Sequence, residues 1–221
     1  MNEKSDSLPV IAVLGGTGKE GPGLALRWAT VGYQIIIGSR QEEKAKRVAS
    51  ELNEKLGTDS ITGLVNADAA QGADICVLTV VQSAHQAALK SLREALQGRI
   101  LVDATARIEF HDPRPPEPPS AAQVAQEILG PGVRVVAAFQ NVPAHALRQN
   151  LGQKISAEVL VCADDVEAAR EVIALAEGGG MKAYYAGGLE NANVVEGLTS
   201  LLISMNKHYG VKTASIEITG I

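Results

Sequence analysis

The sequence is poor in cysteine, has no excess of basic charge and contains no long apolar run. The two cysteines in 221 residues, Cys76 and Cys162, both lie in apolar stretches. Each is therefore expected to be a buried thiol rather than half of a disulfide. The formal net charge is −5, which excludes a general basic field for nucleic acid or an anionic membrane. Any anionic ligand must be held by local groups.

Membrane and export signals are also missing from the sequence. No stretch reaches the ~20 apolar residues of a membrane span, and the first residues, MNEKSDSLP, lack the apolar segment of a signal peptide. A cytoplasmic location is the expectation that follows. The composition, 46% hydrophobic and 20% charged, is that of a globular protein with one large domain, or a large and a small one.

Short apolar runs alternate with helical patterns over the first 140 residues. The expected strands span residues 10–14, 34–38, 61–65, 75–80, 100–102 and 133–139, and the expected helices span residues 23–31, 41–56, 83–96 and 120–129. This alternation predicts an α/β fold, a doubly wound parallel sheet with helices on both faces. Five prolines interrupt the pattern within residues 112–119. They exclude helix and central strand and favour a stiff surface loop, with a binding lid as the alternative.

The remaining residues predict a smaller mixed α/β unit. Strands are expected at residues 158–162 and 182–186, with an edge strand at 215–218. A helix should begin at Asp164 or Asp165 and reach residue 176, and a long helix should span residues 190–209. We therefore divide the chain into residues 1–145 and a smaller C-terminal α/β domain, residues 146–221.

The strongest local motif is a glycine-rich turn between the first strand and the first helix. Gly16, Gly18 and Gly21 satisfy G-x-G-x-x-G in IAVLGGTGKEG. In the Rossmann fold these glycines allow a tight turn, the approach of a pyrophosphate, and close packing of helix on strand. The N–H groups around Thr17–Glu20 would then point at phosphates at a helix N-terminus. A simple glycine turn is the alternative, but the motif stands in the right context on both sides.

The end of the second strand indicates which dinucleotide is bound. An NAD enzyme places an acidic residue there for the ribose hydroxyls, whereas this chain has Ser39 and Arg40, with Lys44 one helical turn later. A hydroxyl, a guanidinium and an ammonium suit a 2′-phosphate. The two cations could simply be solvated, but they lie at a helix N-terminus, where cations are disfavoured. The pattern favours NADP over NAD.

With these motifs in place, the sequence resembles the NADPH-dependent F420 reductases, which pass hydride between NADP(H) and the deazaflavin coenzyme F420. The likeness covers most of the chain and is poor only across residues 107–119. It lies in AVLGGTGKEGPGLALRWA, IIIGSRQEEKA, SITGLVNADAAQGADICVLTV, NVPAHAL and NANVVEGLTSLLISMNKHYGVKTASIEITGI. The resemblance implies reversible hydride transfer between NADP(H) and F420, with F420 as co-substrate.

The resemblance also assigns roles to individual residues. The glycine loop, with Gly16, Thr17, Gly18, Lys19 and Glu20, would hold the pyrophosphate. The 2′-phosphate would contact Ser39, Arg40 and Lys44, and the nicotinamide half of NADP would lie over Thr79, Val80 and Gln82. A wall beside the nicotinamide and the deazaflavin would consist of Val142, Pro143 and Ala144. Where the family often has a proline and an aromatic residue, and later a histidine, this chain has Val81, Gln82 and Gln140.

The sequence shows no catalytic set of side chains and no metal-ligand spacing. Hydride transfer between two cofactor rings needs their stacking and the exclusion of water more than it needs such groups. His85 and His145 are interpreted as surface or hydrogen-bonded structural residues, and Asp103 as a cap or a residue near the ligand. Candidate cations for the acidic tail of the deazaflavin are Arg107, Arg148, Lys207, His208 and Lys212.

Two other functional classes fit parts of the sequence. The first is an NADPH-dependent reductase of another acceptor, such as a ferric chelate, a flavin or an imine. The relatives of that kind usually carry a longer helical second domain, which this chain lacks. The second is a non-catalytic NADP-binding sensor. Finally, the apolar helix at residues 190–209 is expected at a two-fold interface, which predicts a homodimer that acts on small molecules only.

Overall fold

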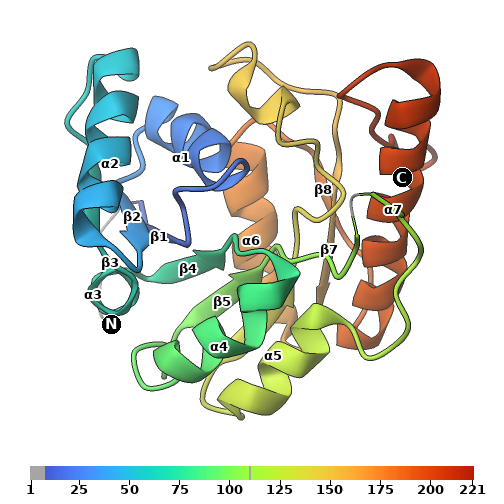
Figure 1. Ribbon diagram of the computed structural model, residues 1–221, viewed down its shortest axis with the longest axis horizontal. Helices are drawn as coiled ribbons and strands as arrows, with labels where there is room; N and C mark the ends of the chain where they lie inside the picture. Colours follow the sequence, from blue (N-terminus) through green and yellow to red (C-terminus); the bar gives the residue numbers. More distant parts are fainter. Residues whose placement is uncertain (1–7, 110) are drawn as a thin grey trace.

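The computed structural model describes residues 8–109 and 111–221. A twisted β-sheet lies at its centre (Figure 1), and this sheet has eight strands. The strand order is β3-β2-β1-β4-β5-β6-β7-β8. The strands are β1 (Ile11–Leu14), β2 (Ile35–Ser39), β3 (Ile61–Val65), β4 (Ile75–Leu78), β5 (Ile100–Asp103), β6 (Arg134–Ala137), β7 (Val159–Ala163) and β8 (Ala183–Tyr185). The first six strands are parallel, β7 runs antiparallel to β6, and β8 is parallel to β7.

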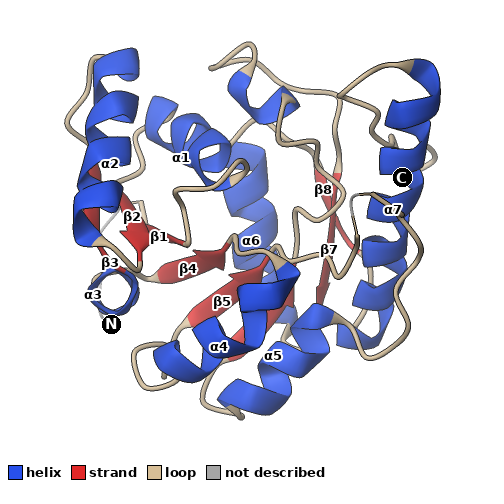
Figure 2. Ribbon diagram, in the orientation of Figure 1, coloured by secondary structure: helices blue, strands red, loops and turns tan. Residues whose placement is uncertain are grey.

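Helices cover both faces of this sheet (Figure 2). They are α1 (Gly21–Thr30), α2 (Glu42–Leu56), α3 (Asn66–Gln71), α4 (Gln82–Leu92), α5 (Ala121–Leu129), α6 (Val166–Gly178) and α7 (Ala192–Tyr209), with short 3-10 turns η1 (Ala146–Arg148) and η2 (Leu189–Asn191). The order 3-2-1-4-5-6 of the parallel strands is that of a Rossmann fold. The predicted fold class is confirmed.

Side-chain alternation along the buried strands divides the core into two layers. In β1, Ile11 and Val13 pack with α1, α2 and α6, whereas Ala12 and Leu14 pack with α3, α4 and α5. Because a strand points successive side chains to opposite faces, an all-apolar strand requires cover on both faces. This is why the strands read as continuous apolar runs without polar alternation.

The C-terminal third extends the same sheet. β7 pairs with β6 through Val136–Ala163 and Ala137–Cys162, and Val161 packs in the same core as Trp28 of α1. The boundary between residues 145 and 146 falls in the connection between β6 and β7, and strands on both sides of it belong to one sheet. The division into two domains stays a prediction.

Most predicted elements are present with ends shifted by a few residues, but one helix was missed and one expected strand is absent. The six-residue helix α3 crosses from β3 to β4 and was not predicted, because it is too short for a periodic apolar pattern. Residues 215–218, expected as an edge strand, are irregular. Glu158 donates its N–H to the Ile216 carbonyl, and its side chain accepts from the Ile218 N–H. The Glu158 carboxylate thus accepts the hydrogen bond that a backbone carbonyl of β7 would accept from a paired edge strand.

The proline-rich segment lies on the surface without helix or strand, as expected of a loop. Its backbone is tied to α7, because the Asn193 side-chain amide donates to the Pro116 carbonyl at 3.1 Å. Pro115 lies close to Gly197 on the same helix. The segment therefore packs along α7. No helix in the described ranges is long and apolar enough to cross a membrane.

Candidate active site

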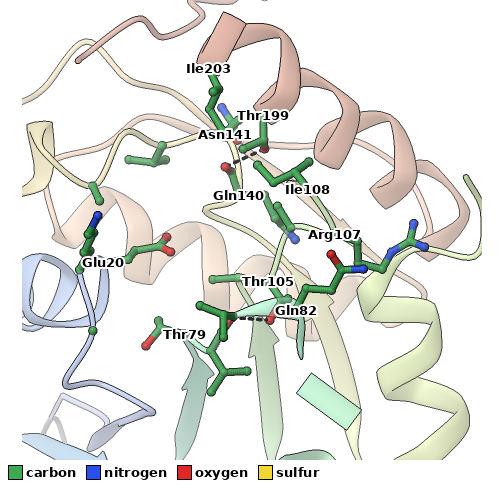
Figure 3. A pocket seen from close by; sticks show the side chains of 18 of the residues that line it. Glu20, Thr79, Gln82, Thr105, Arg107, Ile108, Gln140, Asn141, Thr199 and Ile203 are labelled. Carbon is green, nitrogen blue, oxygen red and sulfur yellow. Dashed lines mark hydrogen bonds between the residues drawn. The ribbon is translucent and has the colours of Figure 1, made fainter. Parts of the chain in front are cut away.

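A large cavity of about 1560 Å³ lies at the carboxyl ends of the parallel strands. Its walls come from the glycine loop before α1, the segments after β4 and β5, the turn after β6, and α7. Figure 3 shows Glu20 on one side of it and Gln82 and Arg107 on the other. Ligands of open α/β sheets bind outside the carboxyl ends of the strands, at the point where the strand order reverses, so the cavity lies where a dinucleotide is expected.

The glycine loop is built as the motif requires. A Cβ on Gly21 would come within 2.7 Å of the Gly16 Cα and 2.9 Å of the Thr79 Oγ1. Helix α1 could not pack so closely on the loop with any larger residue. A Cβ on Gly18, in contrast, would meet only the Gly15 carbonyl oxygen at 3.9 Å. The protein itself does not use the space over Gly18, so that space is left for a ligand.

The loop also offers backbone donors. Among the described residues, the N–H groups of Thr17 and Lys19 have no hydrogen-bond acceptor. They precede the N-terminus of α1, a ten-residue helix whose first turn contains no acidic residue. Free N–H groups at a helix N-terminus favour an anion. The structure therefore fits a pyrophosphate over Gly18.

The end of β2 lacks a carboxylate, and its polar groups are available. Ser39 is buried and its Oγ accepts a hydrogen bond from the Gln41 N–H at 3.2 Å, which leaves the hydroxyl hydrogen free to donate. Arg40 and Lys44 are exposed, and within the described chain neither forms an ion pair. These three residues do not line the large cavity. Ser39 ends β2, Arg40 lies in the turn that follows, and Lys44 lies in the first turn of α2.

The turn after β6 is strained and anchored by aromatic packing. Phe139 has φ +75°, a left-handed conformation that non-glycine residues rarely adopt, and its carbonyl accepts from the Val142 N–H at 2.9 Å. Its ring is fully buried and packs edge-on against Trp28 at a centroid distance of 5.8 Å. Such strain is typical of functional sites, and here it turns Gln140 and Asn141 toward the cavity.

Gln140 and Asn141 each leave one amide oxygen without a partner. The Gln140 Nε2 donates to the Asp103 carbonyl at 2.9 Å, and the Asn141 Nδ2 donates to the Glu158 carbonyl at 2.7 Å. The Oε1 of Gln140 and the Oδ1 of Asn141 are buried and accept nothing from the described residues. Thr199 of α7 donates to the Gln140 carbonyl at 2.8 Å and fixes the same turn (Figure 3). Both oxygens are sealed from solvent, so this turn holds two unsatisfied buried acceptors, which is rare in a folded protein.

A buried ion pair braces the opposite wall. The Arg107 Nε donates to the Glu196 carboxylate at 3.0 Å, and its Nη2 donates to the Asn193 Oδ1 at 2.8 Å. The other Glu196 oxygen accepts the Ala121 N–H at the start of α5. Burial raises the pKa of Glu196, although these contacts favour its charged form. Arg107 therefore connects α7 to the loop after β5, and its charge is already paired.

Glu20 brings a carboxyl group to the proposed phosphate end of the cavity. Its Oε1 is sealed from solvent and has no hydrogen-bond partner among the described residues. Burial raises the pKa of Glu20 to about 8, because the charged form is poorly solvated there. At neutral pH the group is therefore protonated, and it does not repel a phosphate.

The raised pKa of Glu20 predicts how stability changes with pH. Between pH 4.5 and about 8 the folded protein holds a proton on Glu20 that the unfolded chain has lost, so the free energy of unfolding falls as pH rises through this range. We expect Glu20→Gln to match the wild-type melting temperature at pH 4 and to exceed it at pH 8.5. Glu109→Gln, at an exposed carboxyl on the same cavity, is the control. A difference independent of pH would contradict the expectation.

The structure gathers most of the predicted site residues around one cavity and leaves some outside it. The lining includes Gly18, Lys19, Glu20, Thr79, Val80, Gln82, Val142, Pro143 and Ala144. Gly16 lies beneath the loop, where its N–H donates to the Gly38 carbonyl, and Thr17 is outside the lining. Of the predicted tail cations, Arg107, Lys207 and Lys212 line the cavity, whereas Arg148 and His208 do not.

Several lining residues were not predicted from the sequence. Thr105 and Asn141 follow the carboxyl ends of β5 and β6, a position that signals ligand contact in this type of sheet. Thr199 and Ile203 lie on α7, where they read as part of an ordinary helical pattern. For these two, the local sequence carries no signal.

The Rossmann sheet, the open glycine loop and the long cavity define a dinucleotide-dependent oxidoreductase. Residues 10–107 match the family model described as "NADP oxidoreductase coenzyme F420-dependent". The chain is 40% identical to the F420-dependent NADP reductase of Methanothermobacter thermautotrophicus, over 96% of this chain and 95% of the relative. It is 39% identical to the F420-dependent NADP reductase of Methanocaldococcus jannaschii, over 96% and 98% of the two chains.

These similarities identify the family. The chain belongs to the F420-dependent NADP reductases, which confirms the resemblance found in the motifs. A solved structure of a candidate F420-dependent NADP reductase from Arthrobacter sp. FB24 has the same fold, with a TM-score of 0.80 and 26% identity over 96% of this chain and 100% of the other.

Proposed function

We propose that this chain catalyses reversible hydride transfer between NADP(H) and F420, with the two rings stacked in the large cavity. The observation that carries this proposal is the cavity itself, which continues from the glycine loop past the strand ends to α7. Its volume of about 1560 Å³ exceeds the ~300–1,000 Å³ of an ordinary ligand pocket. A nicotinamide half alone would leave much of it unused.

For NADP(H), the protein supplies binding and orientation. The loop at Thr17–Glu20 holds the pyrophosphate, and Ser39, Arg40 and Lys44 hold the 2′-phosphate. The segment Thr79–Gln82 lies under the nicotinamide half, in continuation of β4. These assignments rest on the loop N–H groups and the cations after β2, which have no partner among the described residues, and on the open space over Gly18.

For F420, the proposed contacts come from the turn after β6 and from α7. The cavity wall beside the nicotinamide consists of small side chains, those of Val142, Pro143 and Ala144. Small side chains leave room for two rings to approach face to face. Lys207 and Lys212 line the far end of the cavity and suit an anionic tail. When bound, the two rings carry the hydride chemistry, while these residues fix their distance and exclude water.

Anaerobic stopped-flow mixing of the purified protein with NADPH and oxidised F420 tests the proposed function. Matched loss of the NADPH and F420 absorbance bands, with little reaction from NADH, is the expected result. Binding of NADPH without transfer to F420 would contradict it, and would favour a reductase of another acceptor or a sensor. A ferric chelate, a flavin and an imine offered in place of F420 then separate these alternatives.

Gly18→Ala tests the position of the pyrophosphate. The added methyl group has room in the ligand-free protein, so we expect an unchanged melting temperature. If a pyrophosphate packs on Gly18, the overpacking costs about 1–3 kcal/mol, and the Kd for NADP+ should rise about 5- to 150-fold. Calorimetric titration with NADP+ measures it. Gly197→Ala, at a glycine outside the cavity lining where an added Cβ would meet only the Pro115 Cβ at 3.7 Å, is the control for affinity, and equal affinities in all three proteins would be the contrary result.

We further propose a cytoplasmic homodimer formed through α7. This helix exposes Val194, Leu201, Met205 and Tyr209, with exposed fractions of 39–68%, and their spacing places them along one stripe. The expected mass in light scattering at micromolar concentration is twice that of the chain. Leu201→Glu should give a monomer, whereas Val166→Glu, at an exposed residue of α6, should not. A monomeric wild type would refute the dimer.

A further inference from the structure

A buried histidine and a buried aspartate meet beside the cavity, and the binding roles proposed above do not use them. His85 lies in the first turn of α4, and Asp103 is the last residue of β5. The His85 Nε2 is 2.6 Å from the Asp103 Oδ2, and the exposed fractions of the two residues are 3% and 0%. His85 lines the cavity, whereas Asp103 does not. The imidazole therefore stands between the carboxylate and the ligand space.

The carboxylate is held in one orientation. Its second oxygen, Oδ1, accepts the Thr105 N–H at 3.0 Å, and the Asp103 carbonyl accepts from Gln140. A carboxylate fixed in this way accepts a hydrogen from Nε2, sets the tautomer of the ring and stabilises its protonated form. The Nδ1 of His85 forms no hydrogen bond with a described residue, and His85 lines the cavity. It is the one ring nitrogen left for a ligand.

Hydride transfer to a deazaflavin requires one proton. In the balance NADPH + F420 + H⁺ → NADP⁺ + F420H₂, two electrons and one hydrogen leave NADPH as hydride, and the acceptor gains this hydride and a proton. Among the described residues that line the cavity, His85 is the group with a pre-oriented, carboxylate-backed nitrogen. We propose that His85 donates this proton from Nδ1 and takes it up in the reverse reaction, with Asp103 as its positioning residue.

The proposal rests on the proposed function and deepens it. In the forward direction the imidazolium of His85 gives up the Nδ1 proton and becomes neutral, and its Nε2–H stays on Asp103. Solvent then returns a proton to Nδ1 through the open side of the cavity. In the reverse direction the neutral Nδ1 accepts the proton. The same group thus has to be charged for one direction and neutral for the other.

Asp103 is the ionisable group in direct contact with His85. Lys90 lies on the same helix and lines the cavity. Helices α3 and α5 pack against α4, and their acidic residues are exposed. The remaining charged groups of the described lining are paired or belong to other walls of the cavity: Lys19, Glu20, Arg107, Glu109, His145, Lys207 and Lys212.

The first test uses the wild-type protein. Turnover is measured against pH in both directions, with NADPH and F420 and with NADP⁺ and F420H₂. F420 reduction should fall as pH rises and F420H₂ oxidation should fall as pH drops, with the same apparent pKa in both. Glu109→Gln, at an exposed carboxyl of the same cavity, is the control and should keep both limbs. Parallel profiles in the two directions would refute the proposal.

The second test replaces the histidine. His85→Gln should lower turnover about 100-fold or more in both directions and abolish the pH limb. The Kd for NADP⁺, from fluorescence titration, should change less than about threefold, a change under ~0.7 kcal/mol. Added imidazole should restore part of the rate in His85→Ala, which a purely structural role would not allow. His145→Gln, at an exposed histidine of the same cavity, is the matched control.

The tautomer of His85 can also be measured by NMR, independently of turnover. In ligand-free protein with ¹⁵N-labelled histidine, the neutral His85 ring should carry its proton on Nε2, and Asp103→Asn should weaken this tautomer preference. A ring protonated on Nδ1, or a His85→Gln variant that keeps its rate and pH profile, would overturn the inference while leaving the proposed function intact. If the wild type binds NADPH but does not reduce F420, the proposed function fails and this inference fails with it.

Discussion

Replacing Arg40 by alanine is expected to weaken NADPH and to leave NADH unaffected. Arg40 is exposed directly after β2 and has no carboxylate partner in the described part of the chain. A charge-assisted hydrogen bond is worth about 1.5–3 kcal/mol, so kcat/KM for NADPH should fall about 10- to 100-fold. NADH lacks the 2′-phosphate, and its kcat/KM should stay within about twofold, ~0.4 kcal/mol.

The double variant Arg40→Ala/Lys44→Ala should lower kcat/KM for NADPH further and bring it close to the value for NADH. Arg47→Ala provides the control, because Arg47 is exposed on the same helix and pairs only weakly with Glu51 at 3.8 Å. It should leave both coenzymes unchanged. Equal losses with NADPH and NADH would show that Arg40 acts on the fold or the adenosine and not on the 2′-phosphate.

The largest effect on stability is expected at the ion pair between Arg107 and Glu196. Arg107→Met leaves the Glu196 carboxylate fully buried with only the backbone N–H groups of Ala121 and Arg107 as partners. Removal of one partner of a buried pair typically costs about 3–5 kcal/mol. We expect the free energy of unfolding, from urea denaturation, to fall by roughly that amount.

Two further variants separate the buried charge from lost packing. Arg134→Met breaks an exposed pair with Glu171 at 3.5 Å and should cost at most ~1 kcal/mol. Arg107→Met/Glu196→Leu removes both charges and should regain much of the stability. If the double variant is less stable than Arg107→Met, the pair contributes through geometry, by holding α5 and α7 together, more than through charge.

Glu196 also explains why Arg107 is a poor choice for an anionic tail. From the sequence, Arg107 and Lys207 are both candidate cations for the acidic tail of the deazaflavin. In the structure, Arg107 binds Glu196 and Asn193, whereas Lys207 donates to the backbone carbonyl of His111 and pairs with no carboxylate among the described residues. A carboxylate 89 residues away in the sequence decides this difference, and no local pattern could have revealed it.

The sequence by itself determined the elements whose reasons are local. Apolar runs such as Ile11–Leu14 must be buried on both faces, and Ser120 caps α5 through its own Oγ. The geometry of the glycine loop requires glycine at positions 16 and 21, and Gly18 lies in the same loop. The NADP preference follows equally from neighbours along the chain, Ser39, Arg40 and Lys44. In each case the physical cause lies within a few residues, so the pattern alone could predict it.

The tertiary structure decided what depends on distant segments. It brought Asp103 into hydrogen-bond contact with His85. It placed Gln140 and Asn141 in the cavity wall, after a strained Phe139 that packs on Trp28. It also buried the Glu20 carboxyl, which raises its pKa to about 8. It also joined β7 and β8 to the same sheet and left residues 215–218 irregular. Desolvation, charge pairing and strain arise from groups that meet only after folding, which is why the sequence pattern contains no sign of them.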